Sequence, residues 1–190
     1  MKEKKILIIE DNDELREFIK NCLEHQYDLY EAANGNTGWE IAVSELPDLI
    51  VTDGMMPGMD GNILCTNLKQ DERTSHIPVV MLTARASVEQ QIEGLEHGAD
   101  VYLTKPFSIQ VLQSYITNLL RSKEMLRQRF SQKIFLSPLD IEVGTIEKKF
   151  MERLMAIIND NMEEPDFSVL VLAKELGMSK AVLYKKFNAL

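Results

Sequence analysis

The chain has 190 residues, of which 45% are hydrophobic and 27% charged. This composition is typical of a globular protein, and the length suits one ordinary domain and a smaller one. Its formal net charge is −9. Residues 1–122 hold 20 acidic and 10 basic residues, whereas residues 123–190 hold 10 and 11, which argues against a nucleic-acid surface on the first part and favours a cation site there. The longest apolar runs, such as residues 6–9, are too short to span a bilayer, and the N-terminus lacks a signal-peptide pattern. We therefore expect a cytoplasmic protein without membrane contact, with Cys22 and Cys65 as reduced thiols.

Residues 1–122 alternate between short apolar runs and longer segments with helical periodicity. The apolar runs predict five strands, at residues 5–9, 27–32, 49–52, 79–82 and 101–103. The other segments predict five helices, at residues 13–23, 35–46, 61–69, 87–97 and 108 to about 121. This alternation predicts an α/β domain with a doubly wound, five-stranded parallel sheet that is buried on both faces.

Charged and hydroxyl side chains follow four of these strands, at the edge of the sheet where such folds bind ligands. They are Glu10 and Asp11, Asp53, Thr83 and Lys105. Carboxylates held about 4 Å apart repel each other by roughly 4 kcal/mol per pair at an effective dielectric constant near 20, so positive charge is needed among them. Lys105 supplies one charge and Mg²⁺ supplies two more. A carboxylate beside them is placed to attack phosphorus and form an acyl phosphate, and the Thr83 hydroxyl to bond a phosphoryl oxygen.

Four motifs carry these residues, and together they resemble the receiver domains of two-component response regulators over about residues 4–122. The motifs are Glu10-Asp11, Asp53-Gly54-Met55-Met56-Pro57-Gly58-Met59-Asp60-Gly61, Thr83-Ala84 and Lys105-Pro106-Phe107. The resemblance implies a flavodoxin-like domain that accepts a phosphoryl group from a phosphohistidine of a sensor histidine kinase. Such a domain is a signalling module, whose only catalysis is its own phosphorylation and dephosphorylation.

The resemblance assigns a role to each residue of these motifs. Asp53 is the phosphoacceptor, and Asp11, Asp53 and the main-chain carbonyl of Met55 bind Mg²⁺, while Glu10 acts through a metal-bound water. Thr83 and Lys105 hold the phosphoryl oxygens, and the Lys105–Pro106 peptide bond is cis. The chain departs from the family at Gly54, where a branched apolar residue is common, but this change removes no ligand.

Receivers also carry a conformational switch, which Thr83 and Tyr102 fit. A movement of Thr83 toward the phosphoryl group leaves space that the Tyr102 ring can fill by turning inward. This movement alters the face formed by the fourth helix, fifth strand and fifth helix, which is a candidate homodimer surface. A simpler interpretation of Tyr102 is an aromatic strand residue whose hydroxyl reaches solvent.

Residues 123–190 follow a different pattern. Residues 123–144 are interpreted as a linker, in which 123 to about 129 extend the preceding helix. Helices are predicted at residues 146–162 and 169–176 and from 180 onward, with Thr145, Ser168 and Ser179 as N-caps and Gly177 in a turn.

The spacing of Ala173, Gly177 and Leu183 is that of a helix-turn-helix. The final helix is then expected to expose four residues for DNA contacts, namely Lys180, Tyr184, Lys185 and Lys186. Residues 167–187 also resemble the first helix-turn-helix of AraC-type regulators. A complete AraC-type module has two such motifs, so residues 145–190 are interpreted as a partial module, with DNA as a partner of the full-length protein.

The receiver pattern followed by an AraC-type motif looks like the cytoplasmic end of a hybrid two-component regulator. The sensor histidine kinase is then either a separate protein or an upstream part of the same parent chain, which is membrane-anchored in the hybrid case.

Two other functions were weighed against a phosphorylated receiver. A hydrolase of the haloacid-dehalogenase type also forms an aspartyl phosphate, but it needs a second aspartate where this chain has Met55. A pseudo-receiver that never takes phosphate is disfavoured by the complete set of acidic residues, Thr83 and Lys105. The three histidines, His25, His76 and His97, lack neighbouring ligands at metal-binding spacing and are expected to be surface or loop residues.

Overall fold

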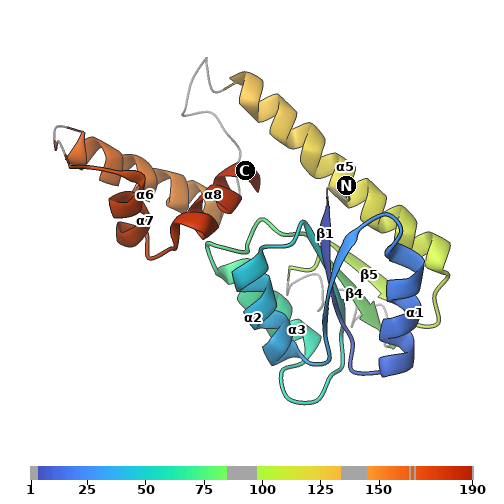
Figure 1. The fold of residues 1–190 in the computed structure, drawn as a ribbon. Helices are drawn as coiled ribbons and strands as arrows, with labels where there is room; N and C mark the ends of the chain where they lie inside the picture. Colours follow the sequence, from blue (N-terminus) through green and yellow to red (C-terminus); the bar gives the residue numbers. More distant parts are fainter. Residues whose placement is uncertain (1–3, 85–97, 134–144, 163, 165, 190) are drawn as a thin grey trace.

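The computed structural model describes residues 4–84, 98–133, 145–162, 164 and 166–189. Its first part is a parallel five-stranded sheet in the order β2-β1-β3-β4-β5, which confirms the predicted fold class (Figure 1). The strands are β1 Lys5–Ile9, β2 Asp28–Ala32, β3 Leu49–Asp53, β4 Val79–Thr83 and β5 Val101–Thr104. Each strand ends within one residue of its predicted bounds.

Helices cover both faces of the sheet. They are α1 Asp13–Leu23, α2 Gly35–Glu45, α3 Gly61–Gln70 and α5 Ile109–Lys133; the helix predicted at residues 87–97 lies outside the described residues. α1, α2 and α3 begin at N-cap side chains that accept a hydrogen bond from the main chain three residues later, at Asn12, Asn34 and Asp60. α5 continues to Lys133, beyond both the predicted end near residue 121 and the predicted extension to 129.

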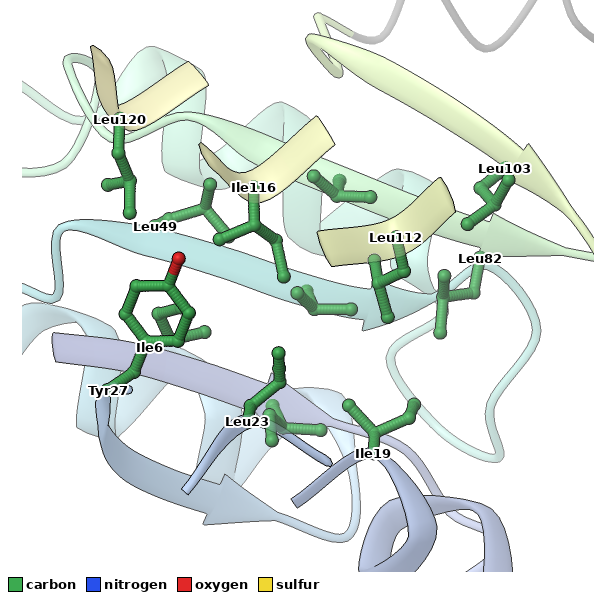
Figure 2. Packing of buried hydrophobic residues seen from close by; sticks show 13 residues of the cluster. Ile6, Ile19, Leu23, Tyr27, Leu49, Leu82, Leu103, Leu112, Ile116 and Leu120 are labelled. Carbon is green, nitrogen blue, oxygen red and sulfur yellow. The ribbon is translucent and has the colours of Figure 1, made fainter. Parts of the chain in front are cut away.

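Alternate residues of each strand enter two separate cores. Ile6 and Ile8 pack against α1 and α5 in one layer (Figure 2), whereas Leu7 and Ile9 pack against α2 and α3 in the other. Burial on both faces explains why the strand sequences are continuously apolar instead of alternating.

The C-terminal part consists of helices, as predicted. They are α6 Thr145–Asn161, α7 Val169–Glu175 and α8 Lys180–Ala189, and they enclose a small core of six buried residues: Phe150, Leu154, Leu172, Ala173, Leu176 and Leu183. Gly177 has φ +70° in the turn between α7 and α8, a conformation that favours glycine.

The predicted caps of this part are only partly confirmed. Ser179 Oγ accepts a hydrogen bond from the main-chain nitrogen of Val182 at 3.2 Å. Ser168 occupies the N-cap position of α7 without a side-chain hydrogen bond, and Thr145 is the first helical residue of α6. None of the helices in the described ranges has both the length and the apolar character needed to cross a membrane.

Candidate functional site

The topology of the sheet brings the polar strand ends together. β1 lies between β2 and β3, so the chain leaves β1 toward one side and later returns on the other, which creates the switch point where doubly wound sheets bind ligands. Ile9 is in register with Thr52, and Asp53 is in register with Leu82. Glu10 and Asp11, which follow Ile9, therefore lie beside the end of β3, where Asp53 is located.

Three carboxylates gather at this edge. One oxygen from each of Glu10, Asp11 and Asp53 lies within 4.8 Å of the others. Glu10 and Asp53 are buried, with exposed fractions of 1% and 7%, whereas Asp11 is exposed. The predicted convergence of these three residues is observed, and solvent reaches the cluster from the side of Asp11.

Lys105 supplies the predicted positive charge. Its Nζ lies 2.9 Å from Glu10 Oε2 and 3.0 Å from Asp53 Oδ2. Burial alone would lower the pKa of Lys105, but the hydrogen bonds to Glu10 and Asp53 outweigh it and raise that pKa. Burial raises the pKa of Glu10, and the hydrogen bond from Lys105 only partly offsets this effect. One ammonium group is thus shared between two buried carboxylates.

The backbone around Lys105 fixes its direction. The main-chain nitrogen of Lys105 donates to the carbonyl of Thr83 at 2.7 Å, and the Lys105–Pro106 peptide bond is cis, as the resemblance implied. Thr83 is buried at the end of β4, so the hydroxyl, the lysine and the acidic cluster belong to one edge of the sheet.

Asp53 and the residue after it are held by the loop that follows β3 and by the first residue of α3. The main-chain nitrogen of Met55 donates to Asp53 Oδ1 at 3.3 Å, and that of Gly61 donates to the carbonyl of Gly54 at 3.1 Å. A Cβ at Gly61 would lie 2.1 Å from the carbonyl oxygen of Asp53. Glycine is required there because the first turn of α3 approaches the backbone of Asp53 too closely for any side chain.

Two positioning residues had no role in the sequence-based interpretation. One is Gly61, whose place in the Asp53 motif was its only signal. The other is Arg16, whose Nη1 donates to the carbonyl of Glu10 at 2.7 Å and holds the acidic turn against α1. No pattern in the sequence indicates this second contact.

The residues of the cluster fit a hard divalent cation. Carboxylate oxygens are the donors that Mg²⁺ prefers, and three of them face one point while a single lysine balances only part of their charge. The carbonyl of Met55 remains a predicted ligand, while its side chain is half-exposed.

Tyr102 lies on β5 in register with Met81. It is partly buried and packs against the core layer that contains Cys65, and this burial raises its pKa. Partial burial of Tyr102 is compatible with the simpler interpretation, a strand residue whose hydroxyl reaches solvent. The switch with Thr83 remains a prediction.

The predicted DNA contacts on α8 divide into three groups. Lys180 and Tyr184 are exposed, with Lys180 Nζ 5.8 Å from the centroid of the Tyr184 ring. Lys185 contacts the end of α2. Lys186 is fully buried with its Nζ 5.0 Å from the centroid of the Phe150 ring. The prediction that Lys186 is exposed for DNA is wrong, because it lies one turn from buried Leu183 on the face that packs against α6.

Neither of the two described histidines belongs to the cluster. His25 is exposed and His76 is partly buried, while His97 lies outside the described residues. In the ranges that the structure describes, the one group of side chains suited to a metal ion is that of Glu10, Asp11 and Asp53.

Comparisons with known proteins agree with this geometry. The family model described as "Response regulator receiver domain" matches residues 6–117. "Histidine kinase P4" of Formosa agariphila is 42% identical over 97% of this chain and 13% of its own length. The "Phosphate regulon transcriptional regulatory protein PhoB" of Pseudomonas aeruginosa is 44% identical over 62% of this chain and 52% of its own length. The chain thus spans at most about half of these two relatives.

Solved structures give the same result for the fold. The Francisella response regulator 1452 receiver domain superposes with a TM-score of 0.59 at 36% identity, covering 63% of this chain and 98% of its own. A receiver domain of a signal transduction histidine kinase from Syntrophus aciditrophicus gives a TM-score of 0.59 at 37% identity, covering 63% of this chain and 91% of its own.

Proposed function

The chain belongs to the response regulator receiver domain family, and on this premise we propose that Asp53 accepts a phosphoryl group from a sensor histidine kinase in a Mg²⁺-dependent reaction. The observation that carries the proposal is the contact of Lys105 with Asp53 inside the cluster of three carboxylates. Glu10 shares the cluster and the contact with Lys105, and the choice of Asp53 over Glu10 follows from the place of Asp53 in the receiver motif.

The side chains divide the chemistry between them. A carboxylate oxygen of Asp53 attacks the phosphorus of the phosphohistidine, the P–N bond breaks, and the imidazole leaves with the electron pair. The Lys105 ammonium, already 3.0 Å from Asp53 Oδ2, stabilises charge on the phosphoryl oxygens, and the Thr83 hydroxyl donates to one of them. Glu10, Asp11, Asp53 and the Met55 carbonyl would hold Mg²⁺, which neutralises charge on the phosphoryl group when bound.

The output of this reaction is proposed to be control of transcription. We assign residues 1–122 to the receiver, 123–144 to a linker and 145–190 to a partial AraC-type helix-turn-helix without its second motif. Lys180, Tyr184 and Lys185 are the proposed DNA contacts of the full-length protein. The switch through Thr83 and Tyr102 and dimerisation through the receiver belong to the same proposal. So do a cytoplasmic location of this chain and a sensor histidine kinase as its partner, in the same parent chain or separate.

The test is phosphorylation of the purified chain by acetyl phosphate, followed by intact mass. We expect one added phosphoryl group with Mg²⁺ and almost none in excess chelator, and no addition to Asp53→Asn. Asp11→Asn should require at least about tenfold more Mg²⁺, because one ligand charge is lost, whereas Glu14→Gln on the exposed face of α1 should behave like the wild type. Equal modification of the wild type and Asp53→Asn would refute the assignment, and a reaction indifferent to chelator would refute the role of the cation.

A further inference from the structure

Arg16 reaches the acidic turn from the first part of α1. Its Nη1 donates to the carbonyl oxygen of Glu10 at 2.7 Å, and only 17% of its side chain is exposed. Hydrogen bonds from a charged donor are stronger than neutral ones, and little solvent competes for this one. The carbonyl belongs to the peptide group that joins Glu10 to Asp11, so the guanidinium group fixes the plane of that peptide.

The other two contacts of Arg16 are weaker. Nη2 pairs with Asp13, whose side chain is 84% exposed, and such surface pairs contribute little to stability. Nε lies 3.7 Å from Glu31 Oε2, while Lys20 pairs with the other carboxylate oxygen of Glu31. The hydrogen bond to the Glu10 carbonyl is therefore what distinguishes Arg16 from the surface cations of α1.

Glu10 and Asp11 differ in how they are held. The main-chain nitrogen of Glu10 donates to the carbonyl of Ala32 at 3.1 Å. Its carboxylate accepts hydrogen bonds from Lys105 at 2.9 Å and from the main-chain nitrogen of Asn12 at 3.4 Å. Asp11 is exposed and has little packing to fix the direction of its side chain. The place of the Asp11 carboxylate in the cluster therefore depends on the main chain that carries it.

We propose that Arg16 is a positioning residue for the cation site, which sets the affinity for Mg²⁺ by holding the peptide group between Glu10 and Asp11. The fixed peptide keeps the Asp11 carboxylate directed at the cluster that it forms with Asp53. The inference rests on the proposed Mg²⁺-dependent phosphorylation. Residues that hold the ligands of a metal contribute to its affinity without touching it.

The position and the charge of Arg16 act on metal affinity in opposite directions. A guanidinium group beside the acidic turn repels Mg²⁺, so loss of its charge alone would lower the Kd for Mg²⁺. Loss of the hydrogen bond to the Glu10 carbonyl frees the peptide and would raise that Kd. The direction of the change in Kd therefore separates a positioning residue from a simple counter-ion.

The test is a Mg²⁺ titration of the full chain without a phosphoryl donor, in which amide ¹⁵N–¹H NMR shifts give the Kd. Arg16→Gln removes both the charge and the hydrogen-bonding fork. Arg16→Lys keeps the charge but lacks the fixed fork of a guanidinium group. Urea denaturation of each variant establishes that it is folded under the conditions of the titration.

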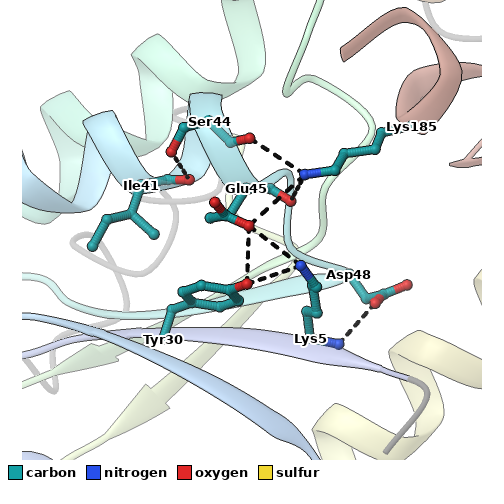
Figure 3. A network of polar contacts seen from close by, with 7 residues as sticks. All are labelled: Lys5, Tyr30, Ile41, Ser44, Glu45, Asp48 and Lys185. Atoms are coloured by element: carbon teal, nitrogen blue, oxygen red, sulfur yellow. Dashed lines mark hydrogen bonds and ion pairs between the residues drawn. The ribbon is translucent and has the colours of Figure 1, made fainter. Parts of the chain in front are cut away.

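Two control variants remove one positive charge each. Lys20→Gln removes a cation one turn further along α1, which pairs with Glu31. Lys5→Gln removes a cation from a polar network at the start of β1. There Lys5 Nζ donates to the Tyr30 hydroxyl at 2.8 Å and lies 3.3 Å from Glu45 Oε2 (Figure 3). The first control matches the charge near the site, and the second matches the loss of a polar contact elsewhere.

We expect the Kd for Mg²⁺ to rise about tenfold in Arg16→Gln and by a smaller factor in Arg16→Lys. Lys20→Gln and Lys5→Gln should stay within about twofold of the wild type. A Kd for Arg16→Gln equal to or below that of the wild type would overturn the inference, as would an equal rise in either control. Absence of Mg²⁺ binding by the wild type would instead contradict the proposed Mg²⁺-dependent function, and the role of Arg16 with it.

Discussion

The ammonium nitrogen of Lys105 lies 3.0 Å from Oδ2 of Asp53, so the residue that follows β5 places a cation directly beside the carboxylate at the end of β3. The same nitrogen lies 2.9 Å from Glu10 Oε2. A phosphoryl group on Asp53 would add negative charge within reach of this lysine, so under the proposed function Lys105 would also bind the phosphoryl oxygens.

Replacement of Lys105 by alanine should lower the free energy of unfolding by about 1–3 kcal/mol, because buried Glu10 and Asp53 lose their charged partner. Mg²⁺ should stabilise this variant more than the wild type, since its charge substitutes for the missing ammonium group. Urea denaturation with and without Mg²⁺ measures both effects. Lys20→Ala removes a lysine that is paired with Glu31 on the surface, and Mg²⁺ should stabilise this variant no more than the wild type. An equal increase in stability with Mg²⁺ in the wild type, Lys105→Ala and Lys20→Ala would contradict the account.

Gly61 should tolerate no side chain. A Cβ there meets the carbonyl oxygen of Asp53 at 2.1 Å and Cα of Gly54 at 2.8 Å, so Gly61→Ala must displace the loop that follows β3. We expect a loss of more than about 2 kcal/mol in stability and a slower phosphorylation of Asp53. Gly58→Ala is the matched control, because its φ of +83° is strained but its Cβ meets open space, at a cost of about 1–2 kcal/mol. A Gly61→Ala protein phosphorylated at the wild-type rate would show that the close approach has no role.

Lys186 should weaken the fold rather than assist DNA binding. Its Nζ is buried without a hydrogen-bond partner in the described part of the chain, and burial lowers its pKa, so the folded state disfavours the charged form. Lys186→Met should raise the free energy of unfolding by about 1 kcal/mol and leave the DNA affinity unchanged. Lys180→Met, on the exposed side of α8, should leave the free energy of unfolding unchanged and weaken DNA binding. A drop in stability of Lys186→Met would mean that the contact with Phe150 outweighs the cost of burial.

His76 should make the protein sensitive to mild acid. Burial, followed by the charges of Lys123, Lys186 and Lys69, lowers the pKa of His76 to about 2. Below the ordinary value near 6.5 the unfolded chain takes up a proton that the folded chain refuses, so stability falls as the pH falls. Between pH 7 and 5 the loss from this group amounts to about 2 kcal/mol. His76→Gln should remove that part of the pH dependence, as measured by urea denaturation at both pH values. If the free energy of unfolding of His76→Gln falls between pH 7 and 5 as much as that of the wild type, the lowered pKa of His76 is contradicted.

The sheet and its site were predictable because both depend on local patterns. Continuous apolar runs that alternate with segments of helical periodicity indicate buried parallel strands joined by helices, and the rule that ligands bind at the carboxyl edge directs attention to Asp53 and Lys105. The role of Gly61 needed the structure, since it depends on how closely α3 approaches β3.

The contacts of α8 were not predictable from its own sequence. Lys185 and Lys186 are adjacent lysines, and helical periodicity alone does not say which face α6 covers. The core around Phe150 places Lys186 inside, whereas Lys185 reaches Glu45, a contact between parts of the chain far apart in sequence.

The most direct test of the phosphorylation site is to locate the modified residue itself. The chain is treated with acetyl phosphate and Mg²⁺, the acyl phosphate is trapped by borohydride reduction, and peptides are mapped by mass spectrometry. The account predicts a single reduced residue, Asp53, with Glu10 and Asp11 unmodified. Modification of Glu10 or Asp11 in place of Asp53, or no trapped residue at all, would contradict it.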